Sequence, residues 1–274
     1  MFGRPRQDGD GPMANQYERI STDLRQQIAS GELAPGEKLP AESQLAKHYD
    51  VSVPTVRQGV GVLQAEGLVE KQHGRGTFVR RQPKKVTRSN ERHQWEKDRA
   101  RQPEDIRKST GATEHDTGLT VDDLTFRAKY DTVPASADLA AEFGVPEGTD
   151  LLRREYRTAY SQERHPFNLV RSYLPLDLVS ANPDLLREDR EPWPGGTQNQ
   201  LHTLGIELDR IVETFRARPP TPEEAEELGL PVGVAVVLLR KTSYDTTDRV
   251  VEVSDVTLPG DRTEMVYTTK LERW

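Results

Sequence analysis

The stretch that most constrains the fold runs from Val51 to Val79 and reads VSVPTVRQGVGVLQAEGLVEKQHGRGTFV. It begins as a helix, because Ser52 can accept an orphan backbone N–H and Pro54 fits a first turn, where a missing N–H costs nothing. Behind this start, apolar residues recur at helical spacing and form one face: Val56, Val60 and Leu63. Gly67 is expected to end the helix.

The second half of the stretch has the pattern of a hairpin. Two short strands are expected at 69–72 and 77–79, with the glycine-containing turn His73–Gly76 between them. The face of the helix opposite the apolar one carries short or polar residues: Thr55, Arg57, Gln58 and Gly61. A short helix followed by a basic hairpin predicts a recognition helix and a wing. The alternative is an ordinary amphipathic helix followed by a surface hairpin.

Two further helices are expected upstream of this stretch. The first covers 16–29, where one face is apolar, and a shorter one covers 41–49 after a turn at Leu39-Pro40. Helix, turn, helix, turn, helix and wing in this order predict a winged helix-turn-helix domain over residues 13–80. Residues 1–12 are rich in Gly, Pro and charged residues, which predicts a disordered extension.

The net charge of −7 is unevenly distributed along the chain. Residues 1–108 carry 20 Lys and Arg against 15 Asp and Glu, whereas residues 109–274 carry 18 against 30. A basic N-terminal part joined to an acidic C-terminal part is typical of a small DNA reader with a larger sensing domain. The alternative is that both are ordinary solvated surfaces.

Composition also excludes several classes of protein. The chain has no cysteine, which excludes disulfides, cysteine-based zinc sites and thiol chemistry. No apolar run approaches the length of a membrane span, and the N-terminus lacks an apolar signal region, so a cytoplasmic location is expected.

Residues 81–112 are expected to form a basic linker. Pro83 breaks the chain, and Ser89-Asn90 can cap a helix that runs to about residue 101. The basic run either continues a surface that faces DNA phosphates or is a solvated tether. Trp95 is expected to dock on a domain rather than to stack on a base.

The C-terminal part contains a duplicated unit. The segments AAEFGVPEGTDLLRR at 140–154 and EELGLPVGVAVVLLRK at 226–241 each have the pattern of a helix end, a Pro-x-Gly turn and an apolar strand. Additional elements are expected as a helix at 197–204 and strands at 124–132, 166–174, 211–217, 249–258 and 265–271. Hairpins interleaved with helices predict an α+β domain on a mostly antiparallel sheet, over residues 113–274.

The N-terminal part resembles the DNA-binding domain of GntR-type bacterial repressors over Tyr17–Val79. The shared motifs are Leu-Pro-x-Glu before the second helix, Thr-Val-Arg-Gln on the third, Glu-Gly-Leu-Val before the wing and Gly-Arg-Gly-Thr-Phe-Val within it. The resemblance implies that the third helix enters the major groove and that the wing tip reaches the minor groove. The residues expected to contact DNA are Ser43, Ser52, Thr55, Arg57, Gln58, Lys71, His73, Gly74, Arg75, Gly76 and Thr77.

Four positions depart from the family pattern. Ser43 stands where many members carry arginine and Val53 where they carry a polar or basic residue, so two groups that could bind phosphate or guanine are missing. Gly59 and Gly61 occupy helix interior positions, each at a cost of about 1 kcal/mol relative to alanine. A closer approach of the backbone to DNA is the one reason the sequence offers for them.

The C-terminal part resembles the UTRA domain, the effector-sensing partner of GntR readers in the HutC subfamily, over about 120–273. The resemblance rests on VPASADLAAEFGVPEGTDLLRREYRT, NLVRSYLPLDL, GGTQNQLHTLGIEL, ARPPTPEEAEELGLP and VVEVSDVTLPGDR, in this order. Such domains bind small metabolites in a cleft between their halves. The residues expected to contact the effector are Arg154, Arg157, Tyr173, Thr197, Gln198 and Glu252.

The residues of this set indicate a site for a polar or anionic group. A helix start near Thr197 offers unpaired N–H groups, and an arginine offers a bidentate fork. Strand alternation places Arg154 and Tyr156 on one face and Arg157 on the other, so not all can serve one pocket. Val170 stands where relatives often have Glu, which favours a ligand less polar than a sugar phosphate.

No catalytic residue, metal site or cofactor is expected, apart from a small-molecule effector. The six histidines lack metal-binding spacing, and no nucleophile elbow, P-loop or dinucleotide fingerprint is present. We therefore predict a homodimeric, ligand-responsive transcriptional regulator, a repressor that reads a pseudo-palindromic operator in double-stranded DNA and does not bind membranes. The alternatives are a regulator with a vestigial pocket and an enzyme similar to chorismate lyase, whose fold UTRA shares.

Overall fold

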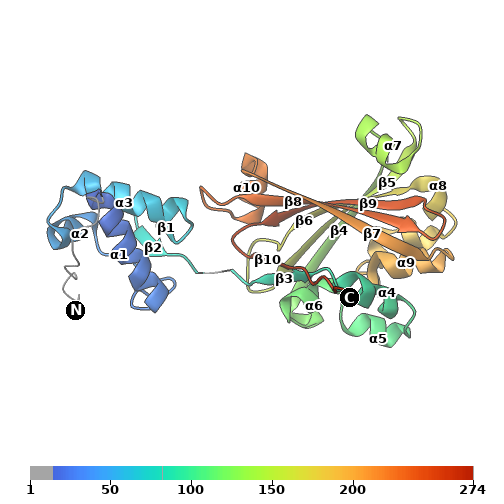
Figure 1. Ribbon diagram of the computed structural model, residues 1–274, viewed down its shortest axis with the longest axis horizontal. Helices are drawn as coiled ribbons and strands as arrows, with labels where there is room; N and C mark the ends of the chain where they lie inside the picture. The colour runs from blue at the N-terminus through green and yellow to red at the C-terminus, as the bar shows by residue number, and fades with distance from the viewer. Residues whose placement is uncertain (1–14, 82, 274) are drawn as a thin grey trace. The chain divides into compact units, whose positions relative to one another are not determined.

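The computed structural model describes residues 15–81 and 83–273, and the chain divides into two compact units (Figure 1). The first unit contains the N-terminal helices and hairpin. The second comprises Pro83–Leu230 and the chain from Ala235 onward. The extension predicted for residues 1–12 lies outside the described residues. Within the described ranges, no helix is long and apolar enough to cross a lipid bilayer.

The first unit has the predicted winged helix-turn-helix order. Its elements are α1 (Gln16–Ser30), α2 (Glu42–Tyr49), α3 (Val53–Ala65), β1 (Val69–Gln72) and β2 (Gly76–Val79). The two strands pair antiparallel, with Val69 opposite Val79. One buried cluster joins the three helices to the hairpin and includes Ile20, Leu24, Leu45, Tyr49, Val56, Val60 and Leu63. The apolar face read from the sequence is therefore the core of this unit.

Helix α3 packs closely on α1, and Gly59 lies at their contact. A Cβ at Gly59 would lie 2.9 Å from the carbonyl oxygen of Tyr17 and 3.1 Å from the side chain of Ile20. This glycine therefore faces the core, and the expectation that it serves a closer approach to DNA is wrong. A Cβ at Gly61 would meet no described atom within 4 Å, and nothing in the structure explains this glycine.

The second unit is an α+β domain, as predicted, around a six-stranded sheet. Its helices are α4 (Arg92–Ala100), α5 (Glu104–Ser109), α6 (Ala112–Thr117), α7 (Ala137–Phe143), α8 (Leu176–Val179), α9 (Gly196–Thr203) and α10 (Pro222–Leu228), with short 3-10 turns η1 (Val121–Asp123), η2 (Pro183–Leu186) and η3 (Glu188–Arg190). Its strands are β3 (Val86–Ser89), β4 (Leu124–Pro134), β5 (Asp150–Tyr160), β6 (Leu169–Pro175), β7 (Leu208–Arg218), β8 (Val236–Asp245), β9 (Val250–Pro259) and β10 (Thr263–Val266). The large sheet has the order β4-β5-β6-β9-β8-β7, and all its pairs are antiparallel.

The large sheet consists of two halves with the same order of elements. The first half is β4, α7, β5 and β6, the second is β7, α10, β8 and β9, and the halves meet where β6 pairs with β9. The strand register gives the sheet two distinct faces. Arg154, Ser172 and Ser254 are neighbours on one, here called the α9 face, whereas Arg153 and Tyr173 lie on the other, the α7 face.

The segment predicted as a basic linker, residues 81–112, is from Pro83 onward part of the second unit. Strand β3 pairs in parallel with β10, and α4 packs against α9 (Figure 1). The Asn199 side chain donates to the Ala100 carbonyl at 2.6 Å, and the Trp95 ring lies 4.4 Å from that of His115. The prediction of a separate linker failed because these partners come from distant parts of the chain. Strand β10 also ends at Val266, so the strand predicted for 265–271 is misplaced.

Candidate functional site

The N-terminal end of α3 presents polar side chains to solvent. The Ser52 hydroxyl caps the helix by accepting the Thr55 N–H at 3.4 Å, and the two hydroxyl oxygens lie 2.8 Å apart. Arg57 is 65% exposed and donates to the Glu42 carboxylate at 2.6 Å, while Gln58 beside it is exposed. A surface ion pair of this kind contributes little stability, so the guanidinium is available to a base edge or a phosphate.

The wing is a short hairpin whose tip carries exposed cations. Its turn needs glycine, because φ is +71° at Gly74 and +121° at Gly76. The Arg75 guanidinium lies 5.6 Å from the centre of the Phe78 ring, and the Lys38 ammonium lies 6.0 Å from the same ring. Lys38 was not predicted as a DNA contact, since it precedes α2 in the sequence and only the folded chain brings it to the wing.

The uneven charge of the chain does not make the reader basic. Residues 1–80 carry 10 Lys and Arg and 10 Asp and Glu, so the excess of five cations in residues 1–108 comes from residues 81–108. From Pro83 this segment belongs to the second unit. Some of its cations are paired there, since Arg92 faces Asp116 and Lys97 faces Glu207. The interpretation of the basic run as a DNA-facing surface stays a prediction.

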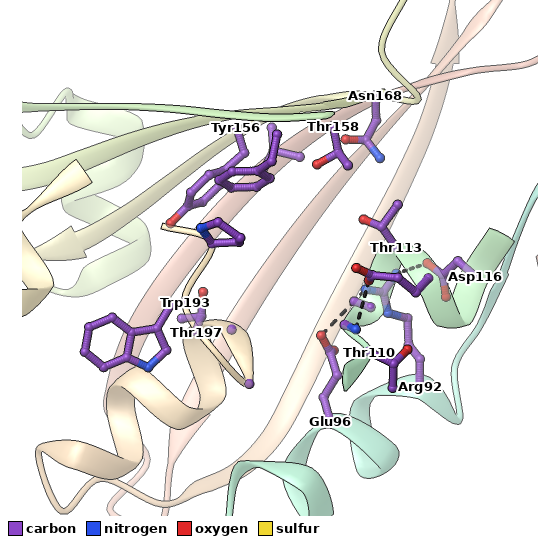
Figure 2. Close-up of a pocket in the computed structure, with 18 of the residues that line it drawn as sticks. Arg92, Glu96, Thr110, Thr113, Asp116, Tyr156, Thr158, Asn168, Trp193 and Thr197 are labelled. Atoms are coloured by element: carbon purple, nitrogen blue, oxygen red, sulfur yellow. Dashed lines mark hydrogen bonds and ion pairs between the residues drawn. The ribbon is translucent and has the colours of Figure 1, made fainter. Parts of the chain in front are cut away.

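A pocket of about 720 Å³ opens on the α9 face of the sheet. Its floor comes from five strands and includes Phe126 on β4, Tyr156 and Thr158 on β5, Ser172 on β6, Glu252 and Ser254 on β9, and Lys241 on β8. Residues of β3, α4 and α6 form one wall, and residues 191–197 before and within α9 form another. Figure 2 shows side chains from the floor and from both walls directed into the same space. The volume lies within the usual range for small-molecule sites.

Arg154 lies under the floor and is 1% exposed. Its guanidinium donates to Gln200 at 2.5 Å, Ser172 at 2.8 Å, Thr197 at 3.0 Å and Glu252 at 3.2 Å. It does not line the pocket, so it acts by fixing the floor and the start of α9 rather than by touching a ligand.

Glu252 neutralises two cations in this network. Its side chain is 2% exposed and lies 3.2 Å from Arg154 and 2.9 Å from the Lys241 ammonium, and it accepts from the Ser172 hydroxyl at 2.7 Å. Burial opposes ionisation of Glu252, but the charges of Lys241 and Arg154 outweigh it and lower its pKa to about 2. The carboxylate is therefore ionised at neutral pH.

A second buried network forms the wall contributed by residues 88–116. The Arg92 guanidinium donates to the Asp116 carboxylate and lies 3.6 Å from that of Glu96 (Figure 2). Arg88 lies 3.9 Å from Asp116, and burial, followed by repulsion from Arg92, lowers its pKa to about 10. His93 lies 3.0 Å from Glu213 on β7.

Within this wall, the pKa of His93 responds to two opposing influences. Burial lowers the pKa of His93, but its contacts with Glu213 and Glu96 outweigh burial and raise the pKa above its ordinary value. Because Glu213 lies on β7, a protonated His93 holds α4 to the sheet.

Glu191 anchors the other wall. Its carboxylate accepts hydrogen bonds from Tyr130, from Tyr156 at 3.0 Å and from Gln200 at 3.0 Å, and it also accepts the Trp193 N–H at 2.6 Å. These bonds hold the residues before α9 beside the floor.

The structure brings together part of the predicted effector set. Thr197 and Glu252 line the pocket, Arg154 contacts both, and the Gln198 amide donates to the His93 carbonyl at 3.0 Å instead of lining the pocket. Arg157 and Tyr173 lie outside the pocket, because strand alternation turns them to the α7 face. Arg157 instead pairs with Glu227.

Sequence reasoning missed the wall formed by residues 88–116. Its charged residues read as a solvated run, and only the spacing of Arg92, Trp95 and Arg99 along one face of the expected helix offered a signal. In the parts of the chain that the structure describes, no group of three or more His, Cys, Asp or Glu side chains is arranged to hold a metal ion.

A winged helix-turn-helix reader joined to a ligand-sized pocket defines a DNA-binding regulator that senses a small molecule. The reader matches the family described as bacterial regulatory proteins, gntR family, over residues 16–79, and the second unit matches the UTRA domain over residues 128–264. The chain is 28% identical over 263 residues to an uncharacterized HTH-type transcriptional regulator of Streptomyces coelicolor, covering 95% of this chain and 94% of that protein. It is 27% identical to the HTH-type transcriptional repressor NagR of Bacillus subtilis, covering 92% and 93% of the two chains.

Solved structures share the same arrangement of elements. A GntR-family transcriptional regulator superposes with a TM-score of 0.63 at 26% identity, covering 94% of this chain and 98% of that one. PhnF from Mycobacterium smegmatis superposes with a TM-score of 0.51 at 22% identity, covering 92% and 100%, which shows a common fold. The chain belongs to the GntR family of bacterial transcriptional regulators, with a UTRA effector domain, the pairing expected of the HutC subfamily. It is a regulator and not an enzyme.

Proposed function

We propose that the protein is a transcriptional repressor that binds its operator as a homodimer and changes its affinity for DNA when a small molecule enters the pocket. The observation that carries the proposal is the pocket of about 720 Å³ in a chain that also has a winged helix-turn-helix reader. The name of the full-length Bacillus subtilis relative, a repressor, supports the direction of regulation. This mechanism needs no cofactor beyond the effector, and its target places the protein in the cytoplasm.

The proposed DNA contacts follow the geometry of the reader. The exposed start of α3, with Thr55, Arg57 and Gln58, reads base edges in the major groove, and the wing tip at His73–Gly76 reaches the minor groove. Two readers would bind half-sites about one helical turn apart.

The proposed route from effector to DNA runs through residues 83–118. This segment directly follows the reader in the chain and also forms one wall of the pocket. A ligand that binds one arrangement of this wall more tightly than another shifts the population of reader arrangements and hence the affinity for the operator.

The test is selection of binding sites from random DNA duplexes with the full chain, followed by footprinting and a mass measurement of the complex. We expect a pseudo-palindromic site occupied by two chains, and a change in affinity when a small-molecule extract of the source cells is added. A single chain on a single half-site would contradict the dimer. Affinity that stays constant over all extract fractions would favour the vestigial pocket.

A further inference from the structure

The pocket contains two kinds of polar side chain that differ in whether they already have partners. Its charged groups already form ion pairs with carboxylates or cations, or hydrogen bonds with backbone groups. Five uncharged side chains in its lining form no hydrogen bond with any residue of the described ranges: Thr110, Thr113, Thr158, Asn168 and Ser254. This division indicates what kind of ligand the pocket can satisfy.

The charged side chains of the lining each have an identified partner. Lys241 lies 2.9 Å from Glu252, and Arg92 donates to Asp116. Arg99 donates to three backbone carbonyls at 2.6, 3.1 and 2.6 Å. A phosphate or carboxylate on the ligand that displaced the partner of Lys241 or Arg92 would leave a buried acid unpaired, and one that displaced the partners of Arg99 would leave backbone carbonyls without a donor.

The remaining charged lining groups follow the same rule. Arg107 donates to the Pro194 carbonyl and to Asn199 at 2.6 Å, and Glu191 accepts from two tyrosines. Arg88 has the loosest pairing, at 3.9 Å from Asp116 and 3.8 Å from Glu213, but both of its neighbours are carboxylates. Among the arginines and lysines of the described lining, Arg88, Arg92, Lys108 and Lys241 face carboxylates, whereas Arg99 and Arg107 are held by neutral carbonyl and amide oxygens.

The five free side chains surround the cavity on two sides. Thr158, Asn168 and Ser254 belong to the sheet or its connections, whereas Thr110 and Thr113 belong to the wall that follows the reader in the chain. Figure 2 shows Thr158 and Asn168 on the side of the cavity opposite Thr110 and Thr113. Hydroxyl and amide groups both donate and accept, so they match ligand hydroxyls without any change of charge.

The apolar part of the lining completes the pattern. The rings of Phe126 and Tyr156 lie 5.7 Å apart on the floor and offer a flat apolar surface. We propose that the effector is an uncharged, polyhydroxylated molecule of sugar size, whose hydroxyls bind the five free side chains while one face rests on these rings. The inference rests on the proposed function. It adds that one ligand contacts both the sheet and the segment that follows the reader in the chain.

The test is the thermal unfolding of the full chain with a matched set of sugars at 10 mM, a concentration on the order of ten times a weak millimolar affinity. The set contains neutral hexoses and disaccharides, the 6-phosphates of the same hexoses, and the matching uronic acids and hexosamines. We expect at least one neutral sugar to raise the melting temperature by mass action and its charged derivatives to have no such effect.

Two conservative variants locate the bound sugar. Thr158→Val and Asn168→Leu each remove hydrogen-bonding groups without adding charge, and each should weaken the stabilising sugar about 2- to 10-fold. Thr125→Val is the matched control, because Thr125 lies on β4 of the same sheet but outside the pocket, and it should leave the affinity unchanged. The melting temperature of each variant without sugar shows whether it is folded.

The other outcomes overturn the inference in distinguishable ways. If a phosphate or uronic acid stabilises the chain more than its neutral parent, the neutral class is wrong and the proposed function stands. If no sugar stabilises the chain, the inference is also wrong, and the response of DNA binding to cell extract then decides the proposed function separately. Equal weakening by Thr125→Val would place the sugar outside this pocket.

Discussion

Replacing Glu252 with glutamine should destabilise the second unit strongly, and more than Asp255→Asn on the same strand. The side chain is 2% exposed and is the shared counter-charge of Arg154 and Lys241. Its loss removes the nearest counter-charge of two cations, one of them fully buried, and breaking a buried pair in this way costs about 3–5 kcal/mol. For a unit of this size, that cost corresponds to a fall in melting temperature of about 6–20 °C.

Tryptophan emission is the assay that isolates this effect. The tryptophans that the structure describes, at positions 95 and 193, belong to the second unit, so their signal does not report on the reader. Asp255→Asn on the same strand is the control: its carboxylate pairs with Arg240 but is 40% exposed, so its loss should cost less than about 1 kcal/mol. Adding Arg154→Met to Glu252→Gln removes one unpaired cation and should recover part of the lost stability.

The stabilising effect of the Glu252 carboxylate should also depend on pH. The folded-state pKa of Glu252 is about 2, below its value in the unfolded chain, so its stabilising effect is complete above the unfolded pKa and is lost as the pH falls toward 2. The difference in melting temperature between the wild type and Glu252→Gln should therefore become smaller below about pH 4. Equal melting temperatures for the Glu252 and Asp255 variants at neutral pH would refute the charge argument.

Five further substitutions test other parts of the molecule. Gly59→Ala should increase hydrogen exchange in α1 and α3, because its Cβ would meet the α1 backbone at 2.9 Å, whereas Gly61→Ala, in open space, should decrease exchange by a stabilisation of up to about 1 kcal/mol. Arg57→Ala should weaken binding to the selected operator by about 1–3 kcal/mol, and an unchanged footprint would remove it from the interface. Lys38→Ala should reduce the salt slope of DNA binding by about 1, measured by titration at several salt concentrations. The raised pKa of His93 means that its contribution to stability is present below its unfolded pKa and is lost as the pH rises through the folded value, so His93→Gln should flatten the fall in melting temperature as the pH rises above its unfolded pKa of about 6.5.

The sequence by itself determined the reader and the outline of the sheet. Both depend on local signals: a capped helix with an apolar face, a glycine turn, and a duplicated helix–turn–strand unit whose order reappears in β4–β6 and β7–β9. Strand alternation also placed Arg154 and Arg157 on opposite faces, which the register confirms. These features follow from spacing along one segment, and a single chain displays such spacing directly.

The tertiary structure alone decided which charged residues are buried and which groups remain free for a ligand. The segment after the reader is rich in cations and reads as a tether, yet Arg92 is buried against Asp116 because α4 docks on α9. Likewise, Arg154 carries the expected charge, but its guanidinium pairs with Glu252 beneath the floor and does not reach the pocket. Burial and pairing depend on partners far apart in the chain, and their energies depend on the surrounding dielectric, so neither composition nor spacing can supply them.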